Sequence, residues 1–141
     1  MKKIIKMSVA LIMAIVFTLS LVSCNTVDKE GLWEEATYLK DMEFGDGATA
    51  ITVEVVAGEQ KVTFTVNTDK KILSDALLEH EIIKAETGPY GLYVTHVNGI
   101  LASDEDKAYW AIYVNGEYGQ KGISETDVTA GTVYKLEYTT Y

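Results

Sequence analysis

The strongest constraint on this fold is a segment that alternates in side-chain character and then turns on an Asn-Gly pair. Within residues 109–114, the apolar face consists of Trp110, Ile112 and Val114. Strict alternation at period two is typical of a strand with one buried face. The Asn115-Gly116 pair that follows favours a tight hairpin, because both residues tolerate the positive φ that such a turn requires. The segment therefore predicts a hairpin in a sheet whose structural core includes these three side chains.

The opposite face of the same strand carries Tyr109 and Tyr113, and Tyr118 comes just after the turn. Tyrosine offers a large flat contact area at little entropic cost, so this face is suited to stack on a flat ligand. Tyr90 and Tyr93, from an earlier strand, are further candidates for the same site. The alternative is ordinary cross-strand packing on a sheet surface. The five tyrosines are the candidate ligand-binding residues of this sequence.

The first 23 residues have the pattern of an export signal. Three lysines precede a nearly unbroken apolar run over residues 7–22, and the run ends at Leu21-Val22-Ser23-Cys24. The run is short for a lasting membrane span, which needs roughly 20 apolar residues. The Leu-Val-Ser-Cys ending resembles the lipobox of bacterial lipoproteins, which implies cleavage before Cys24 and lipid attachment at its sulfur. The resemblance predicts a lipid anchor in the bacterial cell membrane, with the protein on the extracytoplasmic face; the alternative is a secretory signal with an incidental thiol.

Composition limits the partners of the mature chain. Cys24 is the only cysteine, so no disulfide can form within the chain. After removal of residues 1–23, nine basic residues remain against 21 acidic ones, a net charge of −12, and there is no arginine. Such a surface repels phosphate backbones, which argues against nucleic acid as a partner. The 118 residues that remain have the size of one domain, predicted as a tether over 24–31 and a domain over 32–141.

The other periodic segments predict an α+β fold. Alternation over residues 51–55 and 62–66 predicts a hairpin, and helical spacing predicts one helix over about 70–81, with N-caps among residues 67–69. Residues 41–48, rich in Gly, Asp and Glu, are expected to be a turn region. Further strands are expected at residues 92–97 and 134–138. One helix can cover one face of a sheet, so we expect a β-grasp-like mixed sheet with this helix on one face.

Several short motifs together resemble a known family. They include Tyr90-Gly91-Leu92-Tyr93-Val94, Val97-Asn98-Gly99, Tyr109-Trp110 to Val114-Asn115-Gly116, Gly122-Ile123, and Gly131-x-Val133-Tyr134. This pattern resembles the transcobalamin-like C-terminal domain family, most of whose members are domains of unknown function and many of which look like bacterial surface lipoproteins. In the vitamin carriers that name the family, this domain closes over cobalamin held against a helical domain. The resemblance therefore implies contact with a corrinoid, although no helical partner domain is expected within this sequence.

Catalytic and metal-binding patterns are weak or missing in the sequence. There is no Gly-x-Ser-x-Gly elbow, no glycine-rich phosphate loop and no HExxH motif. His80 is expected to pack on the apolar side of the helix, and His96 stands alone in a strand. Residues 104–106, Asp-Glu-Asp, do not have EF-hand spacing and are expected to form a solvated acidic loop. We therefore expect no enzyme activity, no metal site and no required cofactor.

These observations predict a membrane-tethered extracellular binding lipoprotein. Its ligand is expected to be cobalamin, another corrinoid or a different small molecule, taken up with the help of an envelope protein. The alternative is a cell-surface protein–protein interaction or adhesion module with no small ligand, which would use the tyrosine face or a sheet edge.

Overall fold

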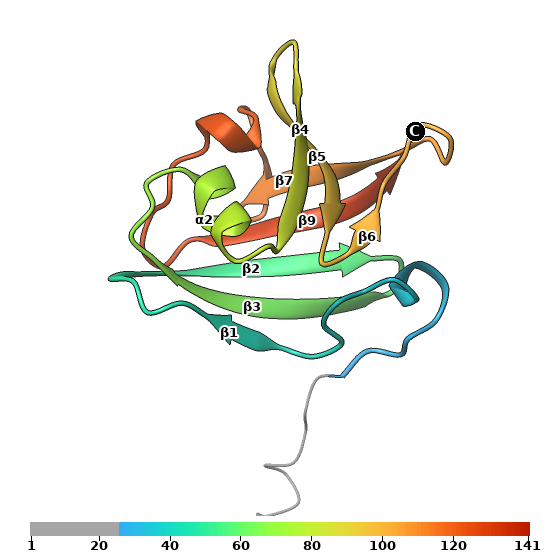
Figure 1. The fold of residues 1–141 in the computed structure, drawn as a ribbon, viewed down its shortest axis with the longest axis horizontal. Coiled ribbons are helices and arrows are strands. Elements are labelled where there is room, and N and C mark those ends of the chain that lie inside the picture. Colours follow the sequence, from blue (N-terminus) through green and yellow to red (C-terminus); the bar gives the residue numbers. More distant parts are fainter. Residues whose placement is uncertain (1–25) are drawn as a thin grey trace, which may run out of the picture.

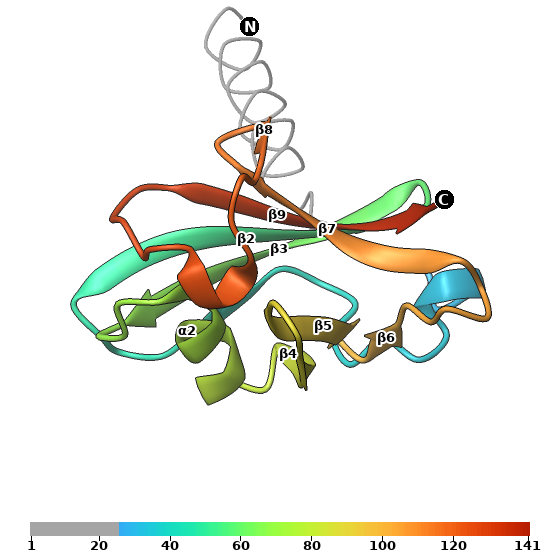
Figure 2. The ribbon, with the colours of Figure 1, turned by 90° about the horizontal axis from the view of Figure 1, so that it is seen from above.

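A computed structural model describes residues 26–141, and it places two β-sheets and one helix around a shared core. A six-stranded mixed sheet spans the molecule, and the helix and a three-stranded sheet lie together on one of its faces (Figure 1, Figure 2). The α+β class with one helix is therefore confirmed for the described residues. The predicted signal peptide and Cys24 lie outside them.

The longer strands occupy the segments of the chain in which apolar and polar residues alternate. In sequence order the elements are η1 (Gly31–Trp33), β1 (Met42–Phe44), β2 (Thr49–Ala57), β3 (Gln60–Thr68), α2 (Leu73–Glu79), β4 (Ile83–Gly88), β5 (Gly91–Val97), β6 (Ile100–Leu101), β7 (Ala108–Val114), β8 (Glu117–Tyr118), η2 (Ile123–Glu125) and β9 (Val133–Thr140). The large sheet has the strand order β1-β3-β2-β9-β7-β8, and the small sheet has the order β4-β5-β6.

Antiparallel hairpins joined by parallel contacts make the large sheet mixed. β2 and β3 form the predicted hairpin, which is paired from Thr49↔Thr68 to Ala57↔Gln60. β9 runs parallel to β2, and β7 pairs antiparallel with β9 from Ala108↔Thr140 to Val114↔Tyr134. The second half of the chain thereby docks on the first through the long-range pairing of β2 with β9.

The core lies between the large sheet and the layer that covers it. Side chains that alternate along the central strands are fully buried, among them Val53, Val55, Phe64 and Leu136. Burying such side chains stabilises the fold by roughly 1.5–3 kcal/mol each. Trp33 closes one end of the core, and its indole N–H donates to the Ala57 carbonyl at 2.9 Å.

The structure corrects the expectation that the helix alone covers the sheet. The small sheet shares this role, because Val94, Val97 and Ile100 belong to the same buried cluster as the large-sheet side chains. The strands in residues 83–101 pair with one another rather than with the large sheet. Local alternation predicts a strand but does not state which sheet it joins.

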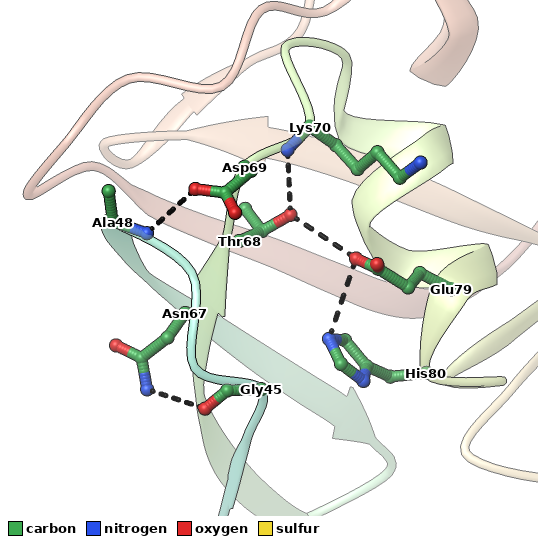
Figure 3. A network of polar contacts seen from close by, with 8 residues as sticks. All are labelled: Gly45, Ala48, Asn67, Thr68, Asp69, Lys70, Glu79 and His80. Atoms are coloured by element: carbon green, nitrogen blue, oxygen red, sulfur yellow. Dashed lines mark hydrogen bonds and ion pairs between the residues drawn. The ribbon is translucent and has the colours of Figure 1, made fainter.

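The helix is shorter than predicted, and the residues expected to cap it bind elsewhere. α2 covers Leu73–Glu79, and its N-cap residue has no side-chain cap. Figure 3 shows why: Thr68 Oγ1 accepts from the backbone N–H of Lys70 at 3.0 Å, and Asp69 accepts from Ala48 at 2.9 Å. The first turn is held instead by the Leu73 N–H, which donates to the Thr126 carbonyl at 2.8 Å.

A strand occupies part of the segment expected to be a turn region. β1 pairs in parallel with β3, so that Phe44 lies level with Val66. Phe44 packs edge to face with Tyr38 and Phe64, at ring-centroid distances of 5.3 and 5.2 Å. Phe64 lies on another strand and β1 has only three residues, so the turn-forming residues around Phe44 masked the strand.

The first described residues lie against the β2–β3 hairpin. Val27 donates its N–H to the Leu39 carbonyl at 2.8 Å, and Asp28 exchanges two hydrogen bonds with the Gln60 side chain. Within residues 26–141, α2 is far too short to cross a bilayer, and the described part contains no helix that could do so.

Candidate functional site

Three of the candidate tyrosines meet on the face of the large sheet that points away from the core. Tyr113 on β7 stands opposite Tyr118 on β8, and their rings are perpendicular with centroids 5.5 Å apart. Tyr109 lies on the same face of β7, and its side-chain hydrogen bond with Tyr118 raises the pKa of Tyr109. The Asn-Gly turn between β7 and β8 produces this arrangement, because it folds Tyr118 back beside Tyr113.

A lysine completes this surface. Lys135 on β9 is the cross-strand partner of Tyr113, and its Nζ lies 4.2 Å from the centre of the Tyr113 ring. The same Nζ lies 3.3 Å from Glu137 Oε2, so the ammonium group has an ionic and an aromatic contact together. We call Tyr109, Tyr113, Tyr118 and Lys135 the tyrosine face. These contacts fix the positions of the side chains relative to one another.

A hollow adjoins the tyrosine face at Lys135. Its volume is about 390 Å³, and it is lined by Glu54, Asn115, Gly116, Val133 and Lys135. It lies at the turn that links β7 to β8, beside the central strands of the sheet. A ligand that stacked on the tyrosine rings would therefore have adjacent space containing one cation, one carboxylate and one side-chain amide.

The other two candidate tyrosines lie apart from this face. Tyr90 is at the tip of the β4–β5 hairpin and is 96% exposed, and Tyr93 on β5 is 45% exposed. Tyr93 lies in the small sheet and Tyr90 in the turn of its hairpin, and this sheet covers the opposite face of the large sheet (Figure 2). Partial burial, followed by the charge of Asp104, raises the pKa of Tyr93. The structure therefore divides the five candidates into a group of three and a separate pair.

The side chains predicted as core on β7 point into the space between the two layers. Trp110 is 5% exposed and packs edge to face with Tyr138, with centroids 5.7 Å apart. Its indole N–H has no hydrogen-bond partner in the described part of the chain. Ile112 and Val114 are partly buried against the same core. Trp110 therefore serves packing, while the tyrosines of the same strand face solvent.

Among residues 26–141, no group of three or more His, Cys, Asp and Glu side chains could hold a metal ion, so neither histidine belongs to such a group. His80 follows α2 and packs beside Phe44, and its Nε2 lies 3.7 Å from Glu79 Oε2 (Figure 3). His96 lies on β5, where partial burial, followed by the charge of Lys84, lowers its pKa.

Comparison with known proteins places the chain in a family. Residues 70–140 match the family model DUF4430, described as a domain of unknown function. The chain belongs to the DUF4430 family. The matched segment begins just before α2 and ends in β9, so it includes the whole tyrosine face. A search of the curated proteins gives no match.

Two solved structures resemble this DUF4430 protein. A "putative metal binding protein" from Ruminococcus gnavus ATCC 29149 is 30% identical, and the match covers 67% of this chain and 99% of that one, with a TM-score of 0.64. Haptocorrin in complex with Cbi is 20% identical, with a TM-score of 0.54 over 70% of this chain. The match spans 27% of haptocorrin, and at this identity it shows a shared fold. That shared fold is consistent with the predicted transcobalamin-like domain.

Lys135 is the member of the tyrosine face that sequence reasoning missed. The alternation of β9 places Lys135 on the outer face of a strand. Only the register Tyr113↔Lys135 shows that it meets the tyrosine ring, and this register joins strands about twenty residues apart. The sequence alone does not show that β7 and β9 are neighbouring strands, and this adjacency is what identifies Lys135 as part of the tyrosine face.

Proposed function

We propose that this DUF4430 protein is a non-enzymatic binding protein that takes a flat small molecule on its tyrosine face. The observation that carries the proposal is the convergence of Tyr109, Tyr113 and Tyr118 beside Lys135 and its adjoining hollow. Flat rings held in place by their neighbours lose little entropy when a ligand stacks on them. We also propose that lipidated Cys24 holds the domain at the extracytoplasmic face of the bacterial membrane.

A corrinoid is the first ligand to test. The shared fold with haptocorrin, whose solved structure contains Cbi, supports this choice. The macrocycle is broad and flat, so its plane suits a surface of tyrosine rings, and its amide side chains suit the polar groups around Lys135. The tyrosine face alone leaves one side of such a ligand exposed, and we therefore expect a second envelope protein to cover it.

The test is a titration of the full-length chain, purified in detergent, with cobinamide and with cobalamin. We expect a saturable change in corrinoid absorbance or tryptophan fluorescence, and about tenfold weaker binding for Tyr113→Ala or Tyr109→Ala, because loss of one stacking ring costs about 1–3 kcal/mol. Tyr90→Ala is the matched control, since Tyr90 lies at the tip of the β4–β5 hairpin, and it should bind as the wild type does.

Two results would count against this function. No saturable change up to high micromolar ligand would reject autonomous corrinoid binding. Equal weakening by Tyr90→Ala and Tyr113→Ala would remove the tyrosine face as the site, even if the ligand were correct.

A protein–protein interaction module is the second candidate function, and the β4–β5 hairpin favours it. β4 is an edge strand of the small sheet, and the hairpin tip carries the exposed Tyr90. Figure 1 shows this hairpin projecting beyond the large sheet. An exposed edge can take another strand through backbone hydrogen bonds, with no small ligand needed.

A further inference from the structure

The free edge of β4 carries unused backbone groups. The Ile82 carbonyl accepts from the Asn98 N–H at 2.7 Å, and the Lys84 carbonyl accepts from Thr95 Oγ1 at 3.2 Å. Both carbonyls therefore point toward β5. The β4–β5 register shifts between Lys84 and Ala85, where β5 has one extra residue, Thr95, while β4 continues without an insertion. Because alternate residues of a strand direct their backbone groups to opposite edges, the odd-numbered residues of β4 point outward. These are Ile83, Ala85 and Thr87, and β4 has no second neighbour in the described sheets.

The charges on β4 are complementary to themselves. Lys84 and Glu86 are exposed, lie on the same face of the strand and flank Ala85. Charged residues on an edge ordinarily discourage pairing. In an antiparallel pair of identical strands centred on Ala85, however, each Lys84 stands opposite Glu86 of the second copy. Centring the pair on Lys84 or on Glu86 instead places like charges opposite each other, which is unfavourable.

The same register gives the exposed hairpin tip a place to bind. A hollow of about 610 Å³ lies beside the start of β4, and its lining includes Tyr38, Leu78 and His80. Leu78 is an exposed apolar side chain at this site. With Ala85 opposite Ala85, the hairpin tip that carries Tyr90 in the second copy extends toward the start of β4 in the first, where this hollow lies. The most exposed tyrosine of one copy therefore lies beside a hollow of the other that is lined by both polar and apolar side chains.

We propose that two copies of this chain associate through antiparallel β4 strands, forming a two-fold symmetric dimer with a continuous six-stranded sheet made from the two small sheets. Ala85 lies on the two-fold axis, two Lys84–Glu86 pairs flank it, and each Tyr90 lies beside the other copy's hollow. Such an interface is isologous, so every contact occurs twice. The contact is small, and we expect an association that is weak in solution and favoured when both copies are anchored in one membrane.

Cysteine cross-linking in the full-length, membrane-bound chain tests the register. Ala85→Cys is expected to give an oxidant-dependent dimer, since directly opposed residues of a hydrogen-bonded pair have Cα atoms about 5.5 Å apart, within disulfide range. Thr87→Cys is the matched control. In the proposed register the two copies of Thr87 are about four residues apart along the strands, roughly 13 Å, and should not cross-link.

Charge exchange provides a second, independent readout on the purified full-length chain. Lys84→Glu and Glu86→Lys should each lower the dimer fraction severalfold, and the double variant K84E/E86K should restore it, because it recreates opposite charges across the axis. Circular dichroism should show all three variants folded, since both side chains are exposed. Tyr109→Ala should leave the dimer fraction unchanged, which separates this interface from the tyrosine face.

The proposal is overturned if Ala85→Cys and Thr87→Cys cross-link equally, or if neither forms a dimer on the membrane. Failure of K84E/E86K to restore the association would also overturn it. Cross-linking of Ala85→Cys to a different protein only would show that the edge takes a foreign strand, and this result too would reject self-pairing.

Discussion

At the scale of single residues, the two Asn-Gly turns show what the sequence can and cannot predict. Asn98-Gly99 and Asn115-Gly116 both have positive φ at each residue, 51° and 80° in the first and 50° and 84° in the second. The dipeptide is enough to predict these turns. It does not predict that Asn98 is 1% exposed and exchanges two hydrogen bonds with the backbone of Tyr38, sixty residues away.

The surroundings of the two glycines lead to a matched prediction. A Cβ at Gly99 would lie 2.5 Å from the Glu35 carbonyl oxygen and 2.8 Å from Thr37 Oγ1, whereas at Gly116 nothing lies within 4 Å. Gly116→Ala should therefore lower the free energy of unfolding by about 1–2 kcal/mol, the cost of left-handed backbone. Gly99→Ala should lower it by a further ~1–3 kcal/mol because of the clash. Urea unfolding of the two variants measures this difference. Equal losses would show that the backbone at Glu35 moves aside freely.

At the scale of elements, alternation identifies the long strands and fails for the short ones. β2, β3 and β7 have seven or more residues with one buried face, so their period is visible in the sequence. β1 and β8 have three and two residues, and their strand character depends on their partners in the sheet. The tyrosine face includes residues from both long and short strands. Its geometry and the position of Lys135 can therefore be seen only in the structure.

The pairing of β4 with β5 gives a prediction for the pH dependence of stability. His96 on β5 lies opposite Lys84 on β4. Partial burial is the main cause that lowers the pKa of His96, and the positive charge of Lys84 lowers it further. The negative charge of Glu86 acts in the opposite direction. The unfolded chain, with a histidine pKa of about 6.5, then binds more protons than the folded chain below that pH. Stability from His96 is complete above about pH 6.5 and is lost as pH falls through the lower folded pKa.

Urea unfolding at about pH 7.5 and about pH 5 tests this sign. The wild type should lose more stability on acidification than His96→Gln, in which this titration is absent. His80, the second histidine of the chain, is present in both proteins, so its contribution cancels in the comparison. A larger loss in His96→Gln than in the wild type would mean that the folded state favours the charged imidazole, which is incompatible with a lowered pKa at His96.

At the scale of the whole molecule, the proposed lipid anchor would decide where the tyrosine face and the β4 edge act. If the proposed lipidation of Cys24 anchors the protein, Cys24→Ala should move it from the membrane fraction to the soluble fraction, because lipid chains contribute about 0.8 kcal/mol per buried CH₂ and stable anchoring needs more than one chain. Ser23→Ala is the matched control: it keeps a small residue before the cysteine and should remain anchored. Fractionation, with fatty-acid labelling of the same samples, measures both.

A Cys24→Ala protein that stayed in the membrane would reject the lipid anchor, and with it the expectation that anchoring raises the local concentration of β4 edges.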